Sequence, residues 1–170
     1  VKPLDSAVVS LCAIEAGHLG AMSVMPREAK IVGTVRTFRP ETQDMIQERL
    51  SALAASVAAG FGAQARLDYE RIYPATINSR AEALFGQRVA EELVGADNTV
   101  TDLEPSMGAE DFSFMLRARP GAYFRIGQGG AEAGRLLHNT VYDFNDEILP
   151  LGAALFARLA ERSMPIGANR

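Results

Sequence analysis

Two strand-like segments followed by one long amphipathic segment constrain the fold of this chain more than any other feature. Residues 7–16 are rich in apolar and β-branched side chains and end at Gly17, which is typical of a strand. Residues 28–38 alternate apolar and polar side chains, the period of a half-buried strand. Pro40 stands where a helix can begin, and residues 41–60 carry apolar side chains at helical spacing. The order predicts a β-β-α unit.

A third alternating segment extends this unit. Residues 64–73 alternate and close at Pro74, so we expect a strand there and a β-β-α-β section overall. One helix protects a sheet face poorly, and a preceding β-α would complete a two-layer α+β unit. The composition shifts at Pro74–Ser79, which is the expected domain boundary.

The second section is expected to begin with a helix. Ser79 and Glu82 have the spacing of a capping box, and Gly95 ends the pattern. The other expected elements are strands near 99–103 and at 121–127, a short helix over 112–116, and a last helix that Asp146 caps, with Pro150 in its first turns.

Composition excludes several classes of protein. The net charge is −4, from 17 basic and 21 acidic residues mixed along the chain. This balance argues against binding to nucleic acid or to an anionic membrane. No run of 18 apolar residues is present, so we expect no transmembrane helix. The single Cys, Cys12, excludes an internal disulfide and fits a reducing compartment, so we expect a cytoplasmic protein and a buried Cys12.

Two loops contain residue types that serve metal hydrolases. Glu110 and Asp111 follow Gly108, and His138 follows a Gly-rich loop. A catalytic zinc normally has three protein ligands and one open position. The chain has two His, of which His18 is the other, and one Cys. Either residues that are not present here complete a site, or there is no site.

Each candidate has a structural interpretation beside the functional one. A lone His is more often a packing or surface residue than a ligand, although loops such as that of His138 often carry ligands. Asp111 could stabilise the N-terminus of the next helix. Glu110 could face a metal or a substrate, and taken alone it would be interpreted as solvated. Arg36 could reach solvent, or hold a substrate carboxylate through a bidentate fork. The Gly127–Gly130 loop lacks the strand-then-helix context of a nucleotide site.

Five segments, taken in order, resemble one family: the metal-dependent amidohydrolases that include hippurate hydrolase, N-acyl-amino-acid deacylase and auxin-conjugate hydrolases. The resemblance is to the C-terminal part of these enzymes and runs from about residue 7 to about residue 160. The segments are Val24-Met25-Pro26-Arg27-Glu28-Ala29, Gly33-Thr34-Val35-Arg36-Thr37-Phe38, Met107-Gly108-Ala109-Glu110-Asp111-Phe112, Pro120-Gly121-Ala122-Tyr123-Phe124 and Leu137-His138.

The resemblance implies a fold of α/β plus α+β class. It places residues 1–76 in a two-layer lid domain that mediates dimerisation, with its N-terminal β-α absent, and residues 77–170 in the C-terminal part of an α/β metallohydrolase domain. It also implies that His138 is a metal ligand, that Arg36 reaches the substrate carboxylate, and that Glu110 lines the active site. Ser23 stands where the family usually has Asn, and Ser lacks the amide donor for a substrate contact.

The function implied by the resemblance is hydrolysis of the amide bond of N-acyl amino acids or related peptide-like substrates by a homodimer. The cofactor would be a divalent metal, zinc first, with manganese, nickel or cobalt as alternatives. The remaining ligands and the general base would lie upstream, so we expect the 170 residues alone to be inactive and to bind metal weakly. The alternative is a non-catalytic dimerisation or binding module derived from such an enzyme.

Overall fold

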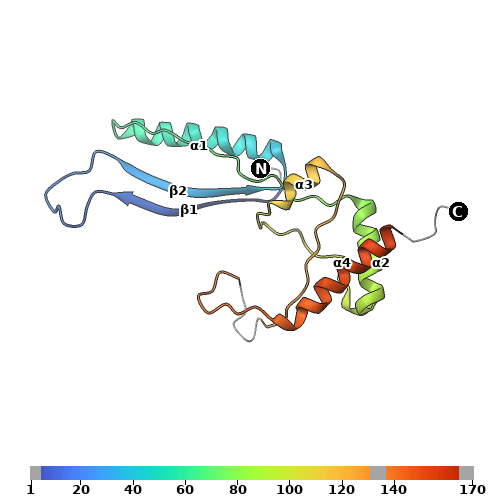
Figure 1. Ribbon diagram of the computed structural model, residues 1–170. Coiled ribbons are helices and arrows are strands. Elements are labelled where there is room, and N and C mark those ends of the chain that lie inside the picture. Colours follow the sequence, from blue (N-terminus) through green and yellow to red (C-terminus); the bar gives the residue numbers. More distant parts are fainter. Residues whose placement is uncertain (1–4, 131–136, 165–170) are drawn as a thin grey trace. The chain divides into compact units, whose positions relative to one another are not determined.

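The computed structural model of the protein describes residues 5–130 and 137–164. The chain forms two compact units, and its elements are labelled in Figure 1. The first unit comprises Val1–Ala75 and Pro105–Glu110, and the second comprises Thr76–Glu104 and Asp111–Arg170. The segment Pro105–Glu110 therefore belongs to the first unit, although its chain neighbours on both sides belong to the second. The fold is mixed α and β, as the sequence predicts.

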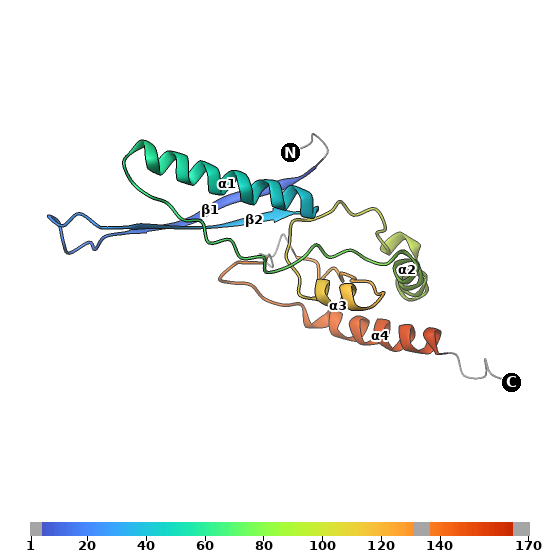
Figure 2. The same cartoon turned by 90° about the horizontal axis from the view of Figure 1, so that it is seen from above.

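The first unit is built on an antiparallel hairpin. Strand β1 (Ala7–Ala16) pairs with β2 (Ala29–Thr37) from Ala7 opposite Thr37 to Ala16 opposite Ala29. Helix α1 (Pro40–Gly60) follows and packs against β2, and it runs beside the hairpin in both views (Figures 1 and 2). These three elements confirm the predicted β-β-α order.

A bulge interrupts β1. The register shifts between Leu11 and Ala13, which leaves Cys12 without a partner on β2. Opposite the bulge, a Cβ on Gly33 would lie 2.4 Å from the Ser10 carbonyl oxygen, so only glycine fits that close approach. Cys12 is exposed, and the prediction that it is buried is wrong. The reason is that a two-stranded ribbon covers little of its own surface.

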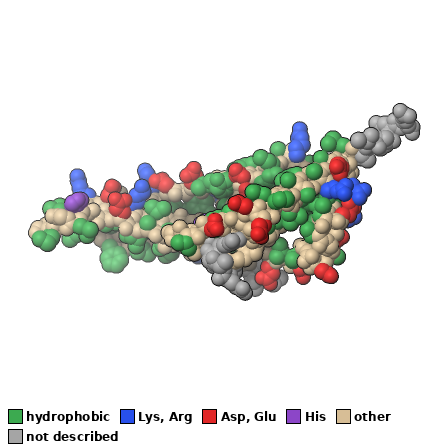
Figure 3. Space-filling model, turned by 60° about the horizontal axis from the view of Figure 1, so that its bottom comes forward, with side chains coloured by type: hydrophobic (Ala, Val, Ile, Leu, Met, Phe, Trp, Pro, Cys, Tyr) green, Lys and Arg blue, Asp and Glu red, His purple; other side chains and the backbone are tan. Residues whose placement is uncertain are grey.

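Burial in the first unit is concentrated at the start of α1. Ile46 is 7% exposed and Thr42 is buried, whereas Leu53, Val57 and Phe61 of the same predicted apolar stripe are exposed, Phe61 to 88%. Apolar side chains also occupy much of the surface in the space-filling view (Figure 3). The helix is therefore predicted correctly, but its apolar stripe is covered only over its first turns.

The predicted strand over 64–73 is not formed. A strand needs a neighbour for its backbone hydrogen bonds, and within the described residues β1 and β2 pair only with each other. The segment is held instead by a side chain, Arg71. Its Nη2 lies 2.6 Å from Asp44 Oδ1 and 2.6 Å from Gln47 Oε1, both on α1.

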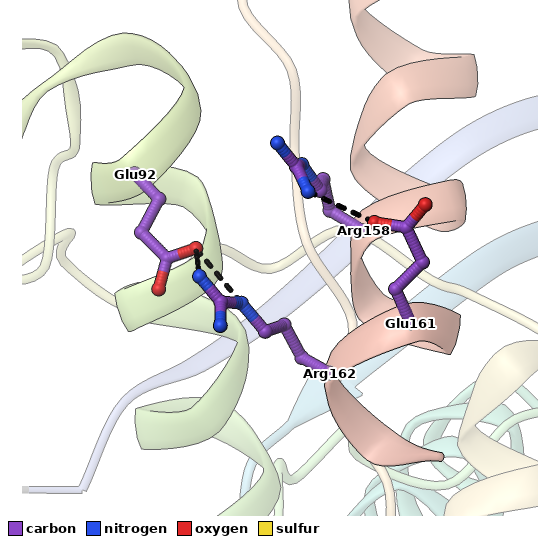
Figure 4. A network of polar contacts seen from close by, with 4 residues as sticks. All are labelled: Glu92, Arg158, Glu161 and Arg162. Carbon is purple, nitrogen blue, oxygen red and sulfur yellow. Dashed lines mark hydrogen bonds and ion pairs between the residues drawn. The ribbon is translucent and has the colours of Figure 1, made fainter. Parts of the chain in front are cut away.

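The second unit is helical. Helix α2 (Arg80–Val94) packs against α4, and Val89 at 2% exposure is its most buried apolar residue. Arg162 of α4 donates from Nε and Nη2 to Glu92 Oε2 of α2, at 3.1 and 2.7 Å, beside a second pair formed by Arg158 and Glu161 (Figure 4). The other elements are η1 (Ala96–Asn98), α3 (Phe112–Ala118), η2 (Asp146–Ile148) and α4 (Leu149–Ser163).

The predicted strands at 99–103 and 121–127 are not formed, because no strand among residues 5–130 and 137–164 pairs with them. In place of a ladder, Asn78 binds both backbone groups of Tyr123: its Nδ2 donates to the carbonyl at 3.1 Å, and its Oδ1 accepts from the N–H at 2.8 Å. A side-chain amide therefore satisfies backbone groups that a strand would have satisfied.

The start of each long helix in this unit differs from the prediction in one detail. Ser79 is the N-cap of α2, but its hydroxyl accepts from Gly121 N–H at 3.2 Å and makes no capping bond, so the capping box with Glu82 is absent. The predicted cap of the last helix, Asp146, caps nothing: Asn145 caps the short helix η2 that precedes α4, because its Oδ1 accepts from Glu147 N–H at 3.2 Å, and α4 has no side-chain capping bond. None of the helices in the described ranges is long and apolar enough to span a membrane.

Candidate active-site residues

Arg36 lies near the end of β2, opposite Val8 of β1. Its Nη1 donates to the carbonyl oxygen of Met107 at 2.6 Å, a contact between residues 71 positions apart within the first unit. The side chain is exposed, and no ion pair in the described part of the chain joins it to a carboxylate. Because a guanidinium carries five N–H donors in a planar fork, donors remain for a planar anion.

Glu110 is half-buried and ends the segment that Arg36 contacts. Asp111 follows at the N-cap position of α3, as predicted, but with helical dihedral angles and without a capping bond from its side chain. Its contribution to α3 is therefore its charge alone, which favours a helix N-terminus.

His138 has a left-handed backbone, with φ of 63°, and among the described residues no other non-glycine residue has a positive φ. This conformation costs about 1–2 kcal/mol for an L-residue, and residues strained in this way cluster at active sites and ligand-binding sites. The next residues fix the turn: Asn139 accepts from Val141 N–H through Oδ1 at 3.1 Å and from Tyr142 N–H through its carbonyl at 3.1 Å. The imidazole is exposed.

The base of the loop that carries His138 is closed by Gln128. Its Oε1 accepts from Asn145 N–H at 3.2 Å, its carbonyl accepts from Asn145 Nδ2 at 3.1 Å, and its Nε2 donates to the Tyr142 hydroxyl at 3.1 Å. The roles of Gln128, Tyr142 and Asn145 were not predicted from the sequence. The sequence feature that could have indicated this contact is Gln128 itself, a polar amide between Gly127 and Gly129 that had no predicted role. Residues 131–136 of the predicted Gly-rich loop lie outside the described residues.

Ser23 lies in the loop between β1 and β2, exposed, at the far end of the hairpin from Arg36. Arg36 is seven positions after Ala29 along β2, which corresponds to about 23 Å at 3.3 Å per residue. The structure does not bring these two predicted substrate contacts together within the chain. Arg36 and Glu110, in contrast, belong to the same unit and are linked through the Met107 segment.

The possible metal ligands of the described residues do not form a cluster. Within 5–130 and 137–164, no group of three or more His, Cys, Asp or Glu side chains could hold a metal ion. The second His, His18, accepts from Gly20 N–H through Nδ1 at 3.0 Å and so stabilises its own turn. The described residues therefore do not form a catalytic metal centre by themselves, and His138 can supply at most one ligand.

Comparison with known proteins places the chain in a class of hydrolases. Residues 6–162 match the model of the Peptidase family M20/M25/M40, and the chain belongs to this family. It is 32% identical to the hippurate hydrolase of Campylobacter jejuni, over 94% of the chain and 40% of that protein. It is 32% identical to IAA-amino acid hydrolase ILR1-like 4 of Arabidopsis thaliana, over 94% of the chain and 37% of that protein. These matches confirm the predicted resemblance.

Two further comparisons agree. The N-acetylcysteine deacetylase of Bacillus subtilis is 30% identical over 94% of the chain and 40% of that protein. Among solved structures, the YXEP protein of Bacillus subtilis, a dinuclear metal-binding peptidase of the M20 family, matches with a TM-score of 0.73 and 30% identity, over 92% of the chain and 42% of that protein. The chain spans about two-fifths of the length of the relatives it matches.

Proposed function

We propose that the protein is a metal-dependent amidohydrolase that cleaves the amide bond of N-acyl amino acids or related peptide-like substrates. The observation that carries the proposal is the family match over residues 6–162. Three of the relatives are named for hippurate, N-acetylcysteine and IAA-amino acids. These names share an acyl group on the nitrogen of an amino acid, so a free carboxylate next to the scissile amide is a common recognition element.

Arg36 is the proposed partner of that carboxylate. Its exposure, and the absence of a carboxylate partner among the described residues, support this role. Bidentate pairing between a guanidinium and a carboxylate gives both energy and orientation. Glu110 is proposed as a contact to the substrate or to a metal ligand, and Ser23 as a weaker substrate contact.

His138 is proposed as one ligand of a divalent metal ion. Zinc is the first choice, because it accepts imidazole readily, and manganese, nickel or cobalt are alternatives. The dinuclear metal binding in the name of the YXEP protein supports a divalent metal. The described residues contain no group of three or more His, Cys, Asp or Glu side chains that could hold a metal ion, so at least part of the ligand set would lie outside them. Residues 1–76 are proposed as part of a lid domain and residues 77–170 as part of the catalytic domain.

Two samples test the proposal: the 170-residue chain and the product of the complete reading frame that encodes it. We expect the reading-frame product to contain a divalent metal and to hydrolyse hippurate or N-acetylcysteine, and the 170 residues alone to do neither. Metal content by mass spectrometry and release of the amino acid are the two measurements. Stoichiometric tight zinc together with hippurate turnover by the 170 residues would refute the proposed inactivity of the chain alone.

A non-catalytic dimerisation module is the second candidate. The first unit supports it, because Leu11 and Ile14 of β1 are 70% and 71% exposed, and the apolar end of α1 is exposed as well. Exposed apolar patches of this kind mark interaction surfaces. Homodimerisation through the first unit is compatible with either function. A reading-frame product that dimerises in light scattering but turns over no amide would favour the module.

A further inference from the structure

The segment Pro105–Glu110 is joined covalently to the second unit at both ends but belongs to the first. It has no helix or strand of its own, and most of it is exposed. Met107 and Glu110 are its two half-buried residues. A short irregular segment of this kind needs contacts from elsewhere to hold one conformation, because the segment buries little surface itself.

Arg36 provides such a contact. Its Nη1 lies 2.6 Å from the Met107 carbonyl oxygen, a short bond with a charged donor. The bond comes from a strand whose position is fixed by its ladder with β1, since Arg36 pairs with Val8. Met107 is three residues before Glu110, so a fixed Met107 carbonyl restricts the backbone that carries the Glu110 carboxylate.

We propose that Arg36 is the positioning residue of this segment: the hydrogen bond from its guanidinium to the Met107 carbonyl orders residues 107–110 and so sets the place of Glu110. One terminal nitrogen serves the segment, and the other donors of the fork remain for an anion. If the proposed function holds, Arg36 also links carboxylate binding to the position of Glu110. Only this consequence rests on the proposed function.

The sequence offers a direct reporter for this bond. Met107-Gly108 is the one Met-Gly pair among the 170 residues. A sample labelled with carbonyl-¹³C methionine and ¹⁵N glycine therefore gives a single correlation that reports the Met107 carbonyl and the Gly108 amide. A carbonyl that loses a hydrogen bond moves upfield in ¹³C, and a segment that loses its anchor becomes mobile on the ps–ns timescale.

The experiment compares the 170-residue chain with its Arg36→Met, Arg36→Lys and Arg71→Met variants. In Arg36→Met we expect an upfield shift of the Met107 carbonyl and a fall of the Gly108 order parameter from about 0.85 to below about 0.6. Arg36→Lys keeps one charged donor and should restore part of both values. Arg71→Met is the matched control, because Arg71 anchors a different segment of the same unit to α1.

An Arg36→Met spectrum equal to wild type would overturn the proposal, and so would an equal change in Arg71→Met. If Arg36→Met does not fold, the Met107 carbonyl shift and the Gly108 order parameter are compared in Arg36→Gln and Arg36→Lys. We expect Gly108 to be more mobile in Arg36→Gln than in Arg36→Lys. The measurement needs neither metal nor turnover. If the amidohydrolase proposal fails, the positioning role of Arg36 can still be correct. If the positioning role fails, the amidohydrolase proposal is unaffected.

Discussion

Gln128 and Asn145 each bind the other's backbone: the Gln128 side-chain oxygen accepts from the Asn145 N–H, and the Asn145 side-chain amide donates to the Gln128 carbonyl. The two residues are 17 positions apart, and His138 lies between them. This reciprocal pair closes the base of the loop, as in compact surface loops whose ends are held together. Two uncharged amides therefore hold together the two chain segments that flank the loop of His138.

Replacing Gln128 by Leu is expected to loosen this closure. The variant removes the side-chain hydrogen bonds of Gln128 to Asn145 N–H and to the Tyr142 hydroxyl. At about 0.5–1.5 kcal/mol each, they stabilise the closed loop by roughly 1–3 kcal/mol. The Asn145 amide should then exchange its hydrogen with solvent roughly 5- to 150-fold faster. Hydrogen exchange followed by NMR measures this rate directly.

Gln87→Leu is the control for that experiment. Gln87 donates to Glu91 within α2 at 2.8 Å, so this variant removes a side-chain amide hydrogen bond of the same unit outside the loop of His138. We expect the exchange of the Asn145 amide to stay at the wild-type rate in this variant. An unchanged rate in Gln128→Leu as well would show that the Gln128 side chain does not hold the loop closed.

Gly86 and Phe124 form a second relationship that a mutation can test. A Cβ on Gly86 would lie 2.1 Å from Phe124 Cζ, so the ring occupies the space of any side chain at this helical position. Gly86→Ala gains about 1 kcal/mol in helix propensity, but overpacking costs about 1–3 kcal/mol. We expect a lower free energy of unfolding and a lower melting temperature by circular dichroism.

Two companions make the Gly86 result specific. Gly60→Ala at the end of α1 meets nothing within 4 Å of the new Cβ, and it should be neutral or stabilising. Phe124→Leu combined with Gly86→Ala should recover part of the loss, because the smaller side chain leaves room for the methyl group. Equal melting temperatures for Gly86→Ala and wild type would mean that the ring moves aside at no cost.

How much of this fold the sequence could predict depends on the range of the interactions involved. The hairpin and α1 are local: their periodic patterns and Pro40 are enough, and all three elements lie within two residues of the prediction. Residues 64–73 have an equally good pattern, but a strand also needs a neighbour, and no described segment pairs with it. Alternation along a segment carries no information about that neighbour.

The candidate site shows the same division. Arg36, Glu110 and His138 could be selected from the sequence by residue type and by the resemblance of the segments around them. The Met107 carbonyl and the Gln128 side chain could not, because a backbone oxygen has no sequence signal and a Gln in a loop has many possible partners. The groups that position the candidate residues are therefore found only in the structure.

Arg36 can be tested on catalysis in the complete reading-frame product. Removal of one partner of a charge pair costs about 2–5 kcal/mol, so in Arg36→Met we expect kcat/KM for hippurate to fall by roughly 30-fold to several thousand-fold. The carboxamide of hippurate has no carboxylate to bind. With this substrate, the fall in kcat/KM of Arg36→Met should therefore lack the part that is due to the carboxylate contact. The ratio of the two losses separates carboxylate binding from any effect on the Met107 segment.

A ratio near one would assign the whole effect of Arg36→Met to positioning and would contradict the proposed carboxylate contact. Arg36→Lys sharpens the comparison. Lysine keeps the charge but cannot present the planar fork, so its loss on hippurate should lie between those of wild type and Met. Steady-state kinetics on the two substrates supply all of these values.

The last prediction concerns His138 and separates its imidazole from its backbone. His138→Asn removes the imidazole but keeps a residue that tolerates a left-handed backbone, and His138→Gly removes the imidazole and the strain together. In the complete reading-frame product both variants should lose bound metal. His138→Gly should unfold at equal or higher temperature than His138→Asn, because glycine adopts φ near 63° without the residual Cβ clash that Asn keeps. His18→Ala should keep its metal, since the His18 ring binds its own turn. Metal content by mass spectrometry, with melting temperatures measured on metal-free samples, gives both readouts; unchanged metal in His138→Asn and His138→Gly would refute the assignment of His138 as a ligand.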